Sequence, residues 1–241
     1  MRPAWWVALL TAVWGIYTGD HLLDALRTPG PLLTYRHRLH QEHARAITAA
    51  LVIAILVGLG AAITLRPPLR LFGIGLSVAV ITYLASAQRL ILASLPKEPV
   101  AGALYAAGIW GGPLLVGASP TTWPLVAALL HGLAAILNLV AMGVFEADVD
   151  RGHGSRSLAL RIGPENARWW TVRLSLAGTG LSFGLLAAVA GDDRLPFAVL
   201  GLQIALQGAM LFTPAWFAEE ERYRVWGDSV FLLGALPRLI G

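Results

Sequence analysis

The chain has 241 residues, of which 56% are apolar and only 13% are charged, and it carries a net charge of +4 and no cysteine. Soluble domains carry about 25% charged residues, so this composition excludes an ordinary water-soluble globular protein. The lack of cysteine excludes disulfides, zinc–thiolate sites and thiol catalysis. The basic residues lie between apolar blocks, which argues against a nucleic-acid-binding patch.

The apolar residues form blocks of about 18 to 25 residues, the length that a helix needs to cross a bilayer. We predict an all-α fold, a polytopic transmembrane bundle that forms a single domain over residues 1–241. The eight predicted helices are 3–18, 46–65, 70–93, 99–117, 122–146, 169–191, 195–217 and 226–240. Charges near both ends of the last helix leave open a half-span or a tilted helix. The Trp-rich start lacks a small-residue cleavage site, so we expect a retained helix and not a signal peptide.

The basic residues predict the orientation of the chain. If all eight helices cross, most of the 18 Lys and Arg residues lie in the loops after helices one, three, five and seven. Basic loops stay in the cytoplasm. We therefore expect a multi-pass protein of the cytoplasmic (inner) membrane, with its N-terminus outside. The dominance of Arg over Lys is typical of a GC-rich bacterial genome.

Two groups of acidic residues lie where predicted helices end on this cytoplasmic side. The first group, in "GDHLLDA", is Asp20 and Asp24, which share one helix face if the helix continues. The second group, in "FEADVDRGHGSRSLALRIG", is Glu146, Asp148 and Asp150, and it ends a long uncharged run. Both helices run from outside to inside, so we expect the two groups to face one another.

The chemistry of these acids leaves two interpretations open. A carboxylate at a helix C-terminus is disfavoured by the helix dipole by about 0.3 to 1 kcal/mol. The side chains either reach water and pair with arginines, or they bind a cation, and oxygen ligands beside phosphates favour Mg²⁺. The same side carries Arg36, Lys97, Arg151 and Arg156, which suit a diphosphate group. The apolar helices behind them suit a lipid tail.

Other polar residues allow simpler interpretations. The segment "RHRLHQEH" is typical of an amphipathic stretch at an anionic membrane surface. Its histidines, His37, His40 and His43, also have a spacing that places metal ligands on one helix face. His131 and Asn138 share a face inside an apolar helix, where polar residues usually point into the bundle and form packing hydrogen bonds.

The two acidic motifs resemble those of the UbiA-type intramembrane prenyltransferase superfamily. In "FEADVDRGHGSRSLALRIG", Glu146 and Asp150 stand at the two Asp positions of the family's second motif, and Arg151 and the Arg156 segment follow. The segment "YTGDHLLDA" resembles the first motif. "RHRLHQEH" and "LPKEPVAGALYAAGIW" resemble a bacterial branch of the superfamily, and the likeness covers roughly residues 5 to 237.

The resemblance implies a helical bundle with a central cavity open to the cytoplasm. Mg²⁺ at the two motifs would hold a prenyl diphosphate, and the allylic cation left by loss of diphosphate would alkylate a hydrophobic aromatic or lipid acceptor. The candidate catalytic residues are Asp20, Asp24, Glu146 and Asp150, and the candidate metal ligands are these four with Asp148. The chain differs from the family in carrying Glu at the first position of the second motif and in lacking the usual first helix.

The sequence thus predicts a Mg²⁺-dependent prenyltransferase. The alternative is a catalytically degenerate relative that binds a lipid phosphate or acts as a membrane scaffold. A third hypothesis is a small transporter, because paired acids in membranes relay ions, but no internal repeat supports it. Membrane lipids are the expected surroundings, and no nucleic-acid partner is expected.

Overall fold

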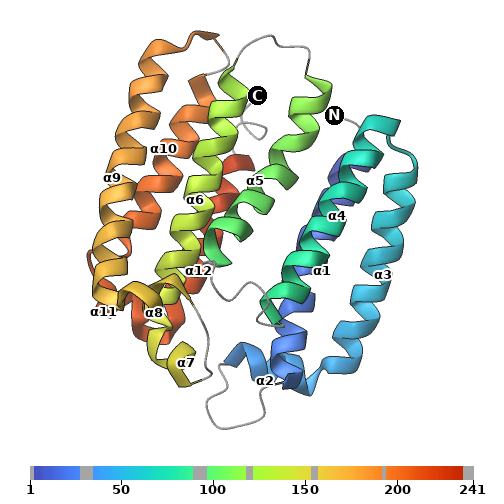
Figure 1. Ribbon diagram of the computed structural model, residues 1–241, viewed down its shortest axis with the longest axis horizontal. Helices are drawn as coiled ribbons and strands as arrows, with labels where there is room; N and C mark the ends of the chain where they lie inside the picture. The colour runs from blue at the N-terminus through green and yellow to red at the C-terminus, as the bar shows by residue number, and fades with distance from the viewer. Residues whose placement is uncertain are drawn as a thin grey trace. The chain divides into compact units, whose positions relative to one another are not determined.

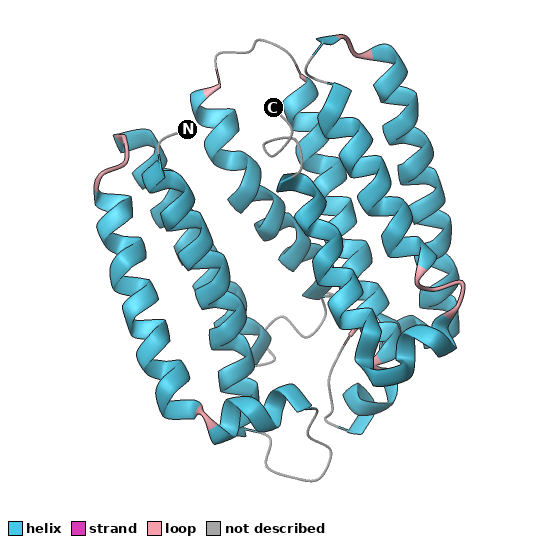
Figure 2. Ribbon diagram, turned by 180° about the vertical axis from the view of Figure 1, so that it is seen from behind, coloured by secondary structure: helices cyan, strands magenta, loops and turns pink. Residues whose placement is uncertain are grey.

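The computed structural model describes residues 3–27, 35–88, 97–117, 122–152, 157–191 and 194–235, and every regular element in these ranges is a helix (Figure 2). The predicted all-α class is therefore confirmed for this part of the chain. The chain divides into two compact units. Unit 1 is Met1–Arg89 with Gly111–Gly117, and unit 2 is Leu90–Trp110 with Ala118–Gly241. The single domain expected from the sequence stays a prediction.

Unit 1 is built from four helices and the end of a fifth. These are α1 (Pro3–Arg27), α2 (Tyr35–Glu42), α3 (Ala44–Ile63), α4 (Pro67–Gln88) and residues 111–116 of α5 (Figure 1). α1 packs along α3, and Trp5 forms a small core with Leu65 and Leu69. The side-chain amide of Gln41 in α2 donates to the carbonyl oxygen of Ala25, 2.6 Å away, and so ties α2 to the end of α1.

Helix α3 of unit 1 has the character of a membrane-spanning helix. Its sequence, "ARAITAALVIAILVGLGAAI", is apolar on every side, yet none of its residues is buried. Large side chains such as Ile53, Leu56 and Ile63 are more than half exposed. An exposed apolar surface of this extent is unfavourable in water and is typical of a helix that faces lipid.

Unit 2 is organised around one buried helix. Its elements are α5 (Lys97–Val116, up to Trp110), α6 (Trp123–Phe145), α7 (Ala147–Gly152), α8 (Leu158–Ile162), α9 (Pro164–Ala188), α10 (Arg194–Ala209), α11 (Pro214–Ala218), η2 (Glu219–Glu221), α12 (Arg222–Val230) and η3 (Phe231–Ala235). α6 packs against both α9 and α10. Leu130 and Leu137 of α6 join Phe197 and Ile204 of α10 in the core. Figure 1 shows α7, α8 and α11 at one end of this unit.

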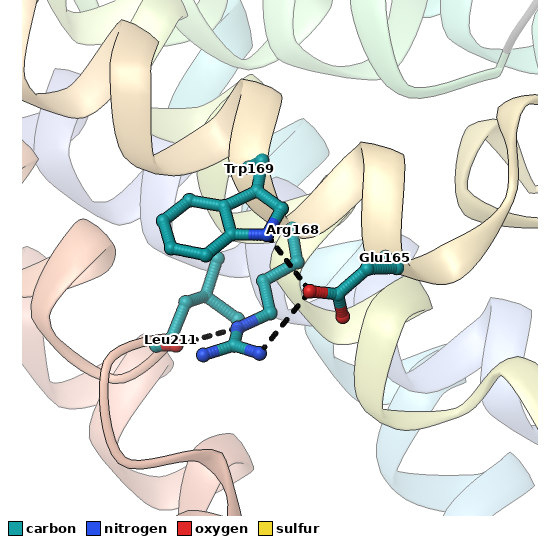
Figure 3. Close-up of polar contacts among 4 residues, drawn as sticks. All are labelled: Glu165, Arg168, Trp169 and Leu211. Carbon is teal, nitrogen blue, oxygen red and sulfur yellow. Dashed lines mark hydrogen bonds and ion pairs between the residues drawn. The ribbon is translucent and has the colours of Figure 1, made fainter.

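The chain bends by 92° between α10 and the segment Pro214–Gly234. A break in an apolar helix leaves backbone groups without partners, and side chains must satisfy them. Arg168 of α9 does this at the bend, because its Nε donates to the carbonyl oxygen of Leu211 at 2.9 Å (Figure 3). Glu165 accepts hydrogen bonds from Arg168 at 3.5 Å and from the Trp169 indole at 2.8 Å, which holds Arg168 in place.

Beyond the bend, two buried glutamines of α10 hold α12. The amide nitrogen of Gln207 donates to the carbonyl oxygen of Gly227 at 3.0 Å, and that of Gln203 donates to Val230 at 3.3 Å. Both carbonyls lie in the second half of α12, so the two glutamines tie this helix to α10. A side chain at Gly227 would overlap Asn138 of α6, so only glycine permits this close approach.

Within the described residues, five helices are long and apolar enough to cross a membrane: α3, α4, α5, α6 and α9. The bent pair of α10 with the segment Pro214–Gly234 gives a sixth if it counts as one span. The predicted eight spans are not confirmed. The last two predicted spans share this bent pair. α1 is long enough but is not one of the five, because tryptophans and the polar residues of its last turns dilute its apolar character.

Candidate functional site

The second acidic motif lies at the end of α6. Glu146 is the C-cap of this helix, and its N–H donates to the carbonyl oxygen of Met142 at 2.9 Å. The N–H of Asp150 donates in turn to the carbonyl oxygen of Glu146 at 2.8 Å, so the helical path continues almost unbroken into α7. Glu146 and Asp150 are therefore one turn apart on one face, as their spacing indicates. Both side chains are half-buried.

Of the three acids, Glu146 forms contacts with residues far away in the sequence. Arg224 of α12 forms an ion pair with its Oε1 at 3.0 Å, and the hydroxyl of Tyr223 donates to the same oxygen at 3.4 Å. The Arg224 side chain is only 13% exposed and that of Glu146 is 22% exposed, so solvent screens this pair less than a surface pair. The contacts join the end of α6 to the start of α12.

Arg224 has a second carboxylate partner. Its Nε lies 2.8 Å from Oε2 of Glu221, and its guanidinium carbon lies 5.3 Å from the centroid of the Tyr223 ring. Glu220 and Glu221 have φ values of 52° and 56°, in the left-handed region that non-glycine residues rarely adopt. Such a conformation costs of order 1 to 3 kcal/mol per residue and persists only where the surroundings enforce it.

The other two acids of the motif differ from Glu146. Asp148 has a side chain that is 95% exposed, and it pairs with Arg151 at 2.7 Å. An exposed i, i+3 pair contributes at most about 1 kcal/mol. The side chain of Asp150 forms no hydrogen bond or ion pair within the described part of the chain. Of the three acids, Asp150 is thus the one whose carboxylate these residues do not compensate.

The first motif lies in unit 1. The structure extends α1 well beyond the predicted residue 18, to Arg27, so Asp20 and Asp24 lie four residues apart on a continuous helix. Asp20 is half-buried and engaged with other residues, whereas the side chain of Asp24 lies outside the description. The two motifs belong to different units, so their meeting in one site stays a prediction.

The predicted phosphate-binding cations have separate outcomes. Arg151 pairs with Asp148, as above. Lys97 is the exposed first residue of α5 and takes part in an interaction of its own. Arg36 begins the first turn of α2, but its side chain lies outside the description, and Arg156 lies outside the described residues altogether. Helix α2 (Tyr35–Glu42) covers all but the last residue of "RHRLHQEH", as expected for an amphipathic stretch.

Two residues with contacts near the motif, Glu98 and Arg224, are not among the predicted site residues. Glu98 is only 2% exposed, and its Oε1 accepts the N–H of Leu158, the first residue of α8, at 2.8 Å. It supplies the negative charge that the start of α8 favours, because the N-cap Ser157 makes no side-chain cap bond. The second contact is Arg224 with Glu146. In the sequence, only the density of charge in "EEERYR" hints at it.

No group of three or more His, Asp or Glu side chains forms a metal-binding cluster within the described residues. Two surface hollows of unit 2 also lie away from the second motif. One is lined by Asn166, Trp169, Trp170 and Arg173, and the other by Trp216, Phe217, Glu220, Arg222, Val225, Trp226 and Ser229.

The two polar residues inside α6, His131 and Asn138, both point into unit 2. The Trp110 indole donates to Nδ1 of His131 at 3.0 Å, and the imidazole stacks on Phe231 at a centroid distance of 5.9 Å. The prediction of an inward-facing packing hydrogen bond for His131 is thus confirmed. Asn138 is buried against Gly227.

Comparisons with protein-family models, with curated proteins and with solved structures each found no match to this chain.

Proposed function

We propose that this protein is a Mg²⁺-dependent enzyme that transfers a prenyl group from a prenyl diphosphate to a hydrophobic acceptor within the membrane. The observation that carries the proposal is the excess of carboxylate at the end of α6. Glu146 and Asp150 lie one turn apart there, Arg224 pairs with Glu146, and the Asp150 carboxylate has no partner in the described part of the chain. Such an all-oxygen donor set suits Mg²⁺, which combines one or two carboxylates with phosphate oxygens.

The proposed reaction assigns separate tasks to the groups. Asp20, Asp24, Glu146 and Asp150 would hold the cation, and Arg36, Lys97, Arg151 and Arg156 would bind diphosphate oxygens. Bound Mg²⁺ neutralises negative charge on the departing diphosphate. The carbon–oxygen bond of the prenyl diphosphate breaks and its electron pair leaves with the diphosphate. The allylic carbon then bonds to the acceptor, which loses a proton.

The proposal is tested by diphosphate release from farnesyl diphosphate by purified protein, with and without Mg²⁺. We expect release only with Mg²⁺, and its loss in Asp20→Asn and Asp150→Asn. Glu219→Gln is the matched control, because Glu219 pairs with the more exposed Arg222 at 2.9 Å and has no assigned role in the site. Turnover that persists in both aspartate variants would refute the site, and turnover without Mg²⁺ would refute the metal dependence.

One observation favours a second function. The carboxylate of Glu146 is already paired with Arg224. Glu146 stands at a position where the prenyltransferase superfamily that the sequence resembles carries Asp. A non-catalytic relative that binds a lipid phosphate is therefore the alternative proposal. It predicts that farnesyl diphosphate raises the melting temperature of the protein while no prenylated product or free diphosphate forms. Detection of a prenylated product by mass spectrometry would eliminate it.

A further inference from the structure

We infer that Arg224 is a further diphosphate-binding residue, and that its ion pair with Glu146 is the contact it gives up when the ligand binds. The inference deepens the proposed function and rests on it for the identity of the lipid. Arg224 pairs with Glu146 of the second motif from a different helix, whereas Arg151 pairs with Asp148 within the motif itself.

The position of Arg224 on its helix is the first support. It lies in the first turn of α12, where the helix N-terminus carries partial positive charge and disfavours a cation. A cation placed there needs an anion. Glu146 and Glu221 supply two carboxylates, and Glu221 does so from a left-handed conformation that itself is unfavourable. Two unfavourable features, a cation at a helix N-terminus and a left-handed glutamate, thus accompany the placement of this one guanidinium.

The geometry of the guanidinium is the second support. Its two ion pairs engage Nε and Nη2, and Nη1 forms no ion pair within the described residues. Arginine presents five N–H donors in a planar fork that matches phosphate oxygens. Tyr223 stacks under this fork and limits its movement. A small displacement of the side chain is thus enough to exchange one oxygen anion for another.

The link to the proposed metal site is the third support. A cation held by Glu146 would take one of the two carboxylate partners from Arg224. The guanidinium would then be left with one carboxylate and with donors for a phosphate. The diphosphate of a prenyl diphosphate is an anion that can replace the lost partner, and it keeps Arg224 fully paired.

The binding of diphosphate by Arg224 can be tested separately from catalysis by measuring the binding of inorganic diphosphate without metal. Isothermal titration calorimetry in detergent with EDTA measures the dissociation constant. Glu146→Gln removes one of the two carboxylate partners of the guanidinium, so we expect about tenfold tighter binding than in the wild-type protein. The double variant Glu146→Gln/Arg224→Gln should lose this gain, and Glu146→Gln/Arg224→Lys should recover only part of it. Each variant is first checked for folding by its melting temperature.

Glu219→Gln is the matched control, because it frees the neighbouring Arg222 in the same turn of chain. It should leave the dissociation constant unchanged. Equal affinities of wild type and Glu146→Gln, or an undiminished gain in the double variant, would overturn the inference. Absence of Mg²⁺-dependent farnesyl diphosphate binding alongside the metal-free gain would refute the proposed function and leave the role of Arg224 standing.

Discussion

At the scale of single residues, the pair of Glu146 with Arg224 makes the clearest claim about stability. Arg224→Gln leaves two carboxylates without their guanidinium, so we expect the free energy of unfolding to fall by about 1 to 3 kcal/mol. Arg222→Gln breaks pairs of a more exposed side chain and should cost less than about 1 kcal/mol. Reversible unfolding in mixed micelles measures both. Equal losses would show that burial does not strengthen the Glu146 pair.

Glu98 gives a second prediction at this scale. Glu98→Ala removes the acceptor of the Leu158 N–H, whereas Glu98→Gln keeps an oxygen there. We expect faster hydrogen exchange across α8 in the alanine variant, with a loss of about 1 to 3 kcal/mol, and a smaller effect in the glutamine variant. Unchanged exchange at Leu158–Ile162 in Glu98→Ala would contradict the anchoring role.

Among helices, the close approach of α12 to α6 is the contact most sensitive to substitution. Gly227→Ala places a methyl group against Asn138 and Met142, so we expect a loss of stability of about 1 to 3 kcal/mol from overpacking. Asn138→Ala in the same protein should recover part of that loss. Gly180→Ala on α9 is the control, because nothing lies within 4 Å of its added carbon. Equal melting temperatures for Gly227→Ala and wild type would contradict the packing.

The limits of sequence-based prediction also appear among the helices. Apolar run length predicts α3, α4, α5, α6 and α9 well, because each is one continuous span. It fails at the bend after α10, where Arg168 of α9 satisfies a carbonyl of the broken backbone and the glutamines of α10 hold α12. Long-range contacts of this kind leave no local pattern. The same reason hides the partners of Glu146 and Glu98, whereas the one-turn spacing of Glu146 and Asp150 is local and predictable.

For the whole molecule, the orientation is a testable prediction. The chain has no cysteine, so single cysteines report their side of the membrane without background. A cysteine at Arg66, between α3 and α4, should react with an impermeant maleimide in intact cells. A cysteine at Gly152, after the second motif, should react only after permeabilisation. The reverse pattern would place the acidic motif on the outer face and contradict the cytoplasmic site.

The proposed function requires that Asp20 and Asp150 both serve the binding of Mg²⁺ and diphosphate. Binding of a non-hydrolysable thiolodiphosphate analogue of farnesyl diphosphate to protein in nanodiscs tests it most directly, since turnover is not required. We predict binding that requires Mg²⁺ and is lost in both Asp20→Asn and Asp150→Asn. Mg²⁺-dependent binding that survives either substitution would contradict a site shared by the two motifs.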